Sequence, residues 1–125
     1  MDIILSGTSG RPIYEQIAQQ IRSAILTGCL SPGEALPSIR ALAQSLSVSV
    51  ITTKRAYEEL EREGVIETRA GKGSFVAQLP ADARRVGLEE QVRVPLEEAV
   101  HTARTLGMTD NTLRELFEET LRSVR

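Results

Sequence analysis

The sequence has little of the chemistry that enzymes and secreted proteins use. It contains one cysteine, one histidine and no tryptophan among 125 residues. Cys29 has no second cysteine to pair with, which excludes an internal disulfide and points to the cytosol. Its position beside a turn predicts a packed small side chain. One His and one Cys give poor support to a metal site or to a Cys–His nucleophile pair. We therefore expect no catalytic residues, no metal site and no cofactor.

Other absences narrow the class of protein further. With two Tyr, two Phe and no Trp, the chain lacks the aromatic surface on which a single-strand binder stacks bases. No apolar run approaches the roughly 20 residues of a membrane span, and the N-terminus lacks the basic start of a signal peptide. The composition, 41% hydrophobic and 26% charged, is that of a soluble folded protein. We expect a cytoplasmic protein without a membrane partner.

The net charge of −2 hides a local asymmetry. Residues 38–57 and 68–79 contain basic residues and no acid, whereas residues 58–63 between them read EELERE. The basic residues of the two islands are Arg40, Lys54, Arg55, Arg69 and Lys72. Two such islands on one face allow a chain that is close to neutral to bind an anionic polymer.

Three amphipathic segments predict helices in the N-terminal half. Apolar residues recur at helical spacing over residues 12–27, and Pro12 suits the first helical position. Ser38 is typical of the N-cap of a short second helix. Ser49 is typical of the N-cap of a third, which ends where Gly64 takes a left-handed conformation.

After the third helix the hydrophobic period changes. Residues 65–69 and 74–78 each predict a strand, and the glycine-containing loop over residues 70–73 suits a hairpin. The element order predicts a mainly α fold with a small β-hairpin. We assign residues 1–79 to a winged helix-turn-helix domain.

Residues 80–125 have a different composition and predict a helical tail. Apolar residues step by three or four through Pro95, which indicates one helix with a kink around residues 91–95. The alternative is a break, in which Pro95 starts a shorter helix. A last helix begins at Thr109 or Asp110.

A pair of helices in so short a tail buries too little surface to be stable alone. We predict that the tail packs against the same helices of a second chain to form a homodimer, rather than folding back on residues 1–79. The expected dimerisation residues are Leu88, Val92, Leu96, Ala99, Ala103, Leu106, Leu113, Leu116, Phe117 and Leu121.

The run GCLSPGEALPSIRALAQSLSVSVITTKRAYEELEREGVIETRAGKGSFVA resembles the GntR family of bacterial transcription regulators. The pieces PGEALPS-x-R-x-LA, VS before the third helix, LEREG and GKGSFV stand in the family's order and spacing. The resemblance covers about half of the chain, from Ile13 to Val76. The rest has no room for the family's usual metabolite-binding domain. Its short two-helix tail is similar to the YtrA-like subfamily, whose tails dimerise and whose genes often accompany ABC transporters.

The resemblance also implies which residues contact DNA. The Arg after LPS contacts the operator in the family, which implies that role for Arg40. Thr52, Lys54 and Gly71 match further contact positions, whereas Val50 stands where the family usually has a polar or basic residue. The predicted DNA-binding residues are Ser38, Arg40, Ser49, Val50, Ile51, Thr52, Lys54, Arg55, Gly71, Lys72 and Gly73.

Family members commonly bind pseudo-palindromes with GT and AC at their outer ends. Because Val50 and Ile51 are apolar and suited to contact thymine methyl groups, we expect an A·T-rich half-site here. The recognition helix would enter the major groove, and the wing with Lys72 would approach the backbone or minor groove.

We therefore predict a homodimeric, sequence-specific regulator, a repressor that occludes a double-stranded DNA operator. The alternative is a winged helix that binds a protein and no operator. An enzyme is not expected, because GKGS on a hairpin lacks the strand-to-helix setting of a phosphate-binding loop. Whether a small-molecule effector binds where the tail meets the winged helix stays open, since no residue cluster identifies its site.

Overall fold

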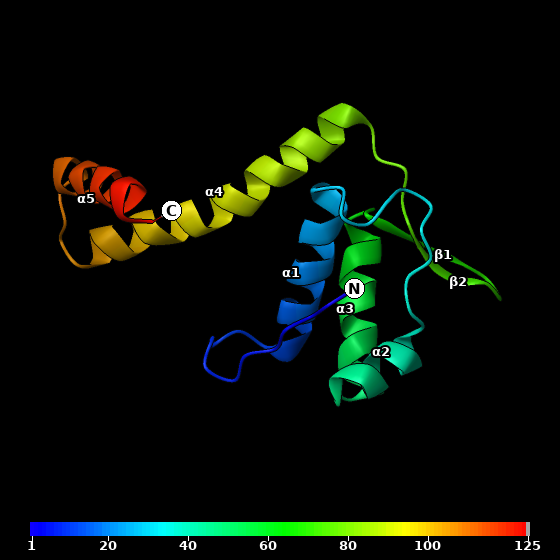
Figure 1. Ribbon diagram of the computed structural model, residues 1–125. Coiled ribbons are helices and arrows are strands. Elements are labelled where there is room, and N and C mark those ends of the chain that lie inside the picture. The colour runs from blue at the N-terminus through cyan, green and yellow to red at the C-terminus, as the bar shows by residue number, and fades with distance from the viewer. Residues whose placement is uncertain (125) are drawn as a thin grey trace. The chain divides into compact units, whose positions relative to one another are not determined.

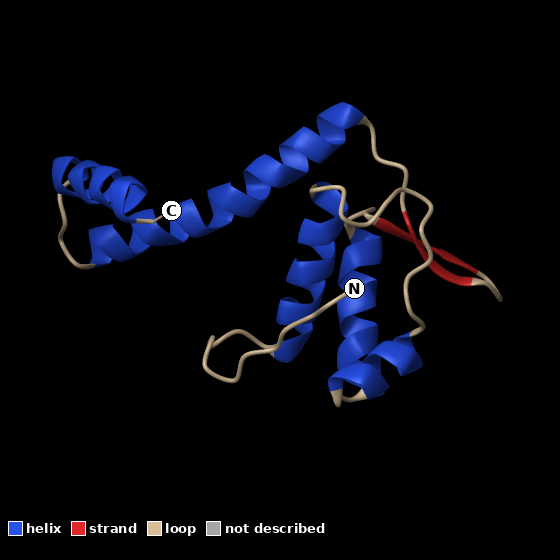
Figure 2. Ribbon diagram, viewed as in Figure 1, coloured by secondary structure: helices blue, strands red, loops and turns tan. Residues whose placement is uncertain are grey.

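The computed structural model describes residues 1–124. Figure 2 shows a mainly helical chain with one short hairpin, as the sequence predicts. The elements are α1 (Ile13–Leu26), α2 (Ile39–Leu46), α3 (Val50–Arg62), β1 (Ile66–Arg69), β2 (Gly73–Val76), α4 (Ala81–Thr105) and α5 (Asp110–Ser123). In the part of the chain that the structure describes, no helix is both long enough and apolar enough to cross a lipid bilayer.

The chain divides into two compact units, Met1–Leu88 and a second that begins at Glu89. The first unit therefore contains the first turns of α4 as well as residues 1–79. In the first turns of α4, Gly87 lies against Leu26 at the end of α1. A Cβ atom on Gly87 would lie 2.8 Å from the Cδ2 atom of Leu26, so only glycine allows this approach without a shift of Leu26.

The core of the first unit lies between α1, α3 and the hairpin. Figure 1 shows α1 and α3 side by side, with α2 beside α3 and the hairpin projecting from the helices. The apolar stripe of α1 supplies one side of the core, and Tyr57 and Leu60 of α3 supply another. The fully buried large side chains are Ile17, Ile21, Ile25, Leu60, Ile66, Val76 and Thr53.

Helix starts follow the sequence closely. The Ser38 hydroxyl accepts a hydrogen bond from the Ala41 N–H at 3.1 Å, and the Thr109 hydroxyl accepts one from the Thr112 N–H at 3.2 Å. The Ser38 cap of α2 is as predicted, and of the two residues predicted to begin α5 it is Thr109 that caps the helix. Pro12 is the N-cap of α1 and not its first residue, since its ψ of 149° is extended.

The turn between α2 and α3 contains an unusual backbone conformation. Ser47 has a φ of 57°, in the left-handed region that an L-residue with a Cβ seldom adopts. Its N–H donates to the Gln44 carbonyl at 3.2 Å, which closes the end of α2. The sharp turn that sets α3 against α2 therefore depends on one strained residue.

The hairpin is tied to the segment before α2. Arg69 pairs with Gly73 across the loop of residues 70–72. The Gly33 N–H donates to the Val76 carbonyl at 2.8 Å, and the Leu36 N–H donates to the Ser74 carbonyl at 2.9 Å. The sequence predicted only a turn here. These bonds fix the base of the wing to the entry of the helix-turn-helix.

Two further predictions have clear outcomes. Helix α4 runs through Pro95 without interruption, so the predicted alternative of a break is wrong. Pro95 is exposed, so water can satisfy the carbonyl that proline leaves without a donor. Cys29 is also exposed, and the prediction of a packed side chain is wrong, because Cys29 lies in the turn where the chain leaves α1.

Candidate nucleic-acid interface

Helix α3 has two chemically different faces, as its periodicity predicts. Thr53, Ala56, Tyr57 and Leu60 are buried against the core. Val50, Ile51 and Lys54 point away from it, and Ile51 is 80% exposed. An isoleucine that exposed contributes nothing to the core, so its surface is available to a partner.

The hydroxyl groups near the helix starts already have partners within the chain. The Ser49 Oγ accepts from the Thr52 N–H at 3.0 Å and donates to the Thr52 Oγ1 at 2.8 Å. Ser38 caps α2 in the same way. Their observed role is to order the first turns of α2 and α3, where free backbone N–H groups favour an anion.

The basic residues of the first island differ in how they are paired. Arg40 and Lys54 are exposed, and within residues 1–124 their side chains have no hydrogen-bond or ion-pair partner. Residues 38–57 contain no acid to neutralise them. Two uncompensated cations at the helix-turn-helix therefore create a positive surface, although the chain as a whole has a net charge of −2.

Arg55 lies in a different environment from these two. Its guanidinium stacks on Tyr14 of α1, with Cζ 3.8 Å from the ring centroid, and its Nη2 donates to the Tyr14 hydroxyl at 3.2 Å. Tyr14 is a residue that the sequence analysis missed. No sequence pattern links two residues 41 positions apart, and only the packing of α1 on α3 brings them together.

Tyr57 connects α3 to the segment before α2. Its hydroxyl donates to the Pro37 carbonyl at 2.7 Å. Burial raises the pKa of Tyr57 to about 12, because the ionised phenolate would be poorly solvated there. The phenol stays neutral at physiological pH and holds the two helices of the motif in register.

The tip of the wing combines backbone freedom with one free cation. Gly71 and Gly73 have φ values of 74° and 108°, which a residue with a side chain would adopt only under strain. Lys72 between them is exposed, and its ammonium has no partner in the described residues. At the base of the loop, Arg69 lies over the Phe75 ring and 3.7 Å from a Glu67 oxygen. Lys72 is therefore the cation of the wing that is free to contact a phosphate.

The second unit exposes most of the residues predicted for dimerisation. Exposed in the single chain are Val92, Leu96, Ala99, Leu106, Leu116, Phe117 and Leu121. Leu113 is half-buried, and Leu88 is exposed but belongs to the first unit. Ala103 is only 4% exposed, so other parts of the same chain already cover it. The exposed set leaves a large apolar surface on α4 and α5.

Known proteins share this arrangement. The family described as "Bacterial regulatory proteins, gntR family" matches residues 13–76, which span all three helices of the motif and both strands of the wing. The chain belongs to the GntR family. It is accordingly a DNA-binding transcriptional regulator and not an enzyme.

Individual GntR-family relatives extend the similarity into the tail. The HTH-type transcriptional repressor YtrA of Bacillus subtilis is 36% identical over 111 residues, which cover 89% of this chain and 85% of YtrA. The solved YtrA of Sulfolobus acidocaldarius is 32% identical, covers 98% of each chain and has a TM-score of 0.59. A complex of the AraR DNA-binding domain with operator ORX1 is 29% identical, with a TM-score of 0.55, over 62% of this chain and 96% of that one.

Proposed function

We propose that this GntR-family chain is a homodimeric repressor that binds a pseudo-palindromic DNA operator. Each subunit presents the N-terminal end of α3 to the major groove and the wing to the adjacent backbone. The observation that carries the proposal is the uncompensated charge of Arg40 and Lys54 beside the capped start of α3. No acidic side chain of this segment pairs with these two cations, and DNA phosphates would neutralise them on binding.

The apolar surface of α4 and α5 supports the homodimer. Helix α5 has no buried residue, and Leu116, Phe117 and Leu121 are all about half exposed or more. Exposed apolar surface of this extent is typical of an interface. A second copy of the same helix pair offers a matching surface, and two-fold symmetry would match an inverted repeat in the DNA.

The names of two relatives support repression. YtrA of Bacillus subtilis is named a transcriptional repressor, and MngR of Escherichia coli is named a repressor of a transport and metabolism system. We propose that this chain likewise represses an operon that encodes a transporter. We also propose that a small-molecule effector binds this protein and releases it from the operator.

The decisive experiment is selection from a randomised duplex pool, followed by titration of the best sequence against salt. We expect an enriched inverted repeat bound by a dimer. If about four basic groups in each subunit contact phosphates, the slope of log K against log [salt] is about −7. Half-sites lie about one helical turn, roughly 34 Å, apart.

Matched variants test where the protein binds. Arg40→Glu with Lys54→Glu abolishes operator binding, because it places two acids against phosphates. Arg62→Glu makes one such charge reversal at the other end of α3, where Arg62 is paired with Glu59 at 2.7 Å, and leaves binding nearly intact. Equal affinity of the double variant and the wild type would overturn the proposal.

Two further experiments test the protein-binding alternative and the dimer. Salt-insensitive capture of a protein, without enrichment of any duplex, would establish the winged helix as a protein-interaction module. Sedimentation of the free chain tests the dimer separately. Leu116→Glu with Phe117→Glu produces monomers if the tail is the interface, because each carboxylate would be buried against apolar surface.

A further inference from the structure

The stacked pair of Tyr14 and Arg55 lies at the edge of the proposed DNA-contacting surface. Arg55 follows Ile51 by four residues and Lys54 follows it by three, so the two cations lie one turn further along α3, on either side of Ile51. The apolar residue is thus framed by two basic ones. In a major groove the middle of such a face meets base edges and its margins meet the phosphate walls.

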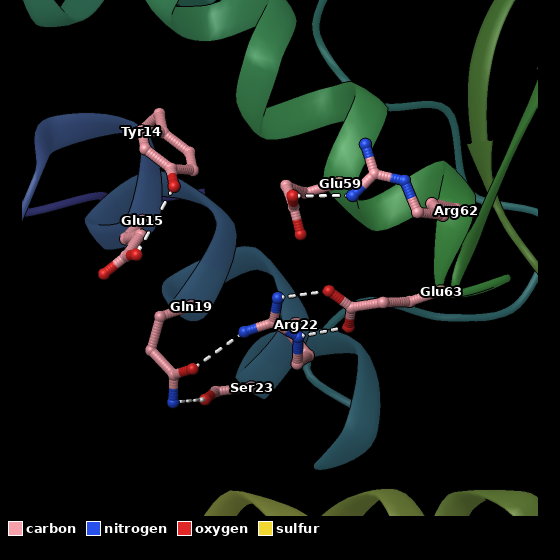
Figure 3. Close-up of polar contacts among 8 residues, drawn as sticks. All are labelled: Tyr14, Glu15, Gln19, Arg22, Ser23, Glu59, Arg62 and Glu63. Carbon is pink, nitrogen blue, oxygen red and sulfur yellow. Dashed lines mark hydrogen bonds and ion pairs between the residues drawn. The ribbon is translucent and has the colours of Figure 1, made fainter.

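The two framing cations differ in their freedom. Lys54 has no partner within the described chain, whereas the Arg55 guanidinium is held flat over the Tyr14 ring and bonded to its hydroxyl. The Tyr14 hydroxyl in turn donates to the Glu15 Oε1 at 3.4 Å (Figure 3). This leaves the lone pairs of the hydroxyl oxygen to accept from Arg55. Glu15 is the acid that faces this pair from α1.

The stacking on Tyr14 leaves most N–H donors of the Arg55 guanidinium available for hydrogen bonds. Arginine has five N–H donors, and the hydrogen bond to Tyr14 uses one. The remaining donors lie at the edge of the planar group, which suits a phosphate oxygen pair. An arginine that is already held in place loses less side-chain freedom when it binds.

The same stripe of α3 contains a contrasting arginine. Arg62 lies about two turns beyond Arg55 and bonds to the Glu59 carboxylate at 2.7 Å, so its charge is neutralised locally. Figure 3 also shows Arg22 of α1 bonded to Glu63 near the end of α3, which ties the two helices together away from the DNA-facing end. Neither of those arginines is held by a neutral aromatic partner, as Arg55 is.

We propose that Tyr14 is a positioning residue, which holds the Arg55 guanidinium in place to bind a DNA phosphate at the α1 side of α3. This inference rests on the proposed operator binding and adds to it a residue outside the helix-turn-helix. The ligand is a phosphodiester of the backbone, so the contact contributes affinity and orientation without base preference.

The test compares affinities and salt slopes on the enriched operator for the wild type, Tyr14→Phe, Tyr14→Leu, Arg55→Gln and the Tyr14→Leu/Arg55→Gln double variant. Arg55→Gln removes one phosphate contact per subunit, so the slope of a dimer becomes shallower by about 2. Tyr14→Leu weakens binding about threefold per half-site, hence about tenfold for the dimer, because Arg55 must be immobilised on binding. Tyr14→Phe keeps the ring and has a smaller effect.

The double variant decides between positioning and an independent role. If Tyr14 acts through Arg55, adding Tyr14→Leu to Arg55→Gln causes no further loss of affinity. Arg62→Gln, which removes the same charge from the same helix, leaves the slope unchanged. Thermal unfolding of each variant identifies any loss of fold, and Tyr14→Phe, which keeps the packing of the ring, still tests the pair if Tyr14→Leu unfolds.

Contrary outcomes separate this inference from the proposed function. Additive losses in the double variant, or an unchanged slope in Arg55→Gln, overturn the positioning role while operator binding by the wild type stands. A wild-type chain that enriches no duplex overturns the proposed function and this inference together.

Discussion

The exposed isoleucine of α3 makes the sharpest prediction about DNA sequence. Ile51 is 80% exposed and Val50 beside it is 46% exposed, at the end of the helix that we propose enters the major groove. The thymine methyl group is the apolar feature of that groove. We predict that the selected operator has a thymine in each half-site opposite Ile51, and that the protein recognises its methyl group.

The expected magnitude follows from the area that the contact buries. Covering one methyl group contributes about 0.8 kcal/mol. A symmetric dimer makes the contact twice, so replacing both thymines by uracil costs about 1.6 kcal/mol, or roughly 15-fold in Kd. Uracil pairs as thymine does and lacks only the methyl group, so the duplex keeps its hydrogen-bonding pattern.

The assay is a cycle of two proteins and two duplexes. Ile51→Ala removes the contact without weakening α3, since Ile51 is outside the core and Ala favours helix. The variant should bind the thymine and uracil operators with equal affinity. Ile4→Ala, at a 79% exposed isoleucine in the N-terminal segment, is the control and should preserve the full 15-fold difference predicted here. The same thymine-to-uracil penalty in wild type and Ile51→Ala would refute the reasoning.

The remaining predictions concern stability and use denaturant unfolding. Burial raises the pKa of Tyr57 from 10.0 to about 12, so the tyrosine of the unfolded chain ionises first as pH rises. The free energy of unfolding therefore falls between these two pH values. Tyr57→Phe should lack this part of the alkaline loss of stability. Gly87→Leu should destabilise the first unit by about 1–3 kcal/mol through overpacking against Leu26, and an unchanged midpoint would contradict the close approach. Ser47→Gly should stabilise by about 0.5–1 kcal/mol because it relieves the left-handed φ of 57°, whereas Ser47→Val should destabilise.

Local chemistry made much of the fold predictable. N-caps at Ser38, Ser49 and Thr109 and the spacing of apolar residues are short-range signals, and they located all five helices to within a few residues. The hairpin was predictable for the same reason, since its glycines lie at the turn. The two faces of α3 followed from its period alone.

The missed features all depend on residues distant in sequence. Three contacts arise only when separate elements pack. They are the stacking of Arg55 on Tyr14, the approach of Gly87 to Leu26 and the hydrogen bonds from residues 33–36 to β2. No local propensity encodes such contacts, because each partner alone is compatible with many neighbours.

The tail shows that a periodic pattern predicts a face and not its partner. The spacing of apolar residues predicted α4 and α5 correctly, yet α5 buries no residue and α4 buries only Ala103 among those described. Helices of this length are marginal in water when their apolar faces stay exposed. The exposed apolar period supports the homodimer proposed above, because a second copy offers the same helix pair. The proposed dimer predicts that the stability of the tail depends on protein concentration, whereas the stability of the winged helix, which has its own core, does not.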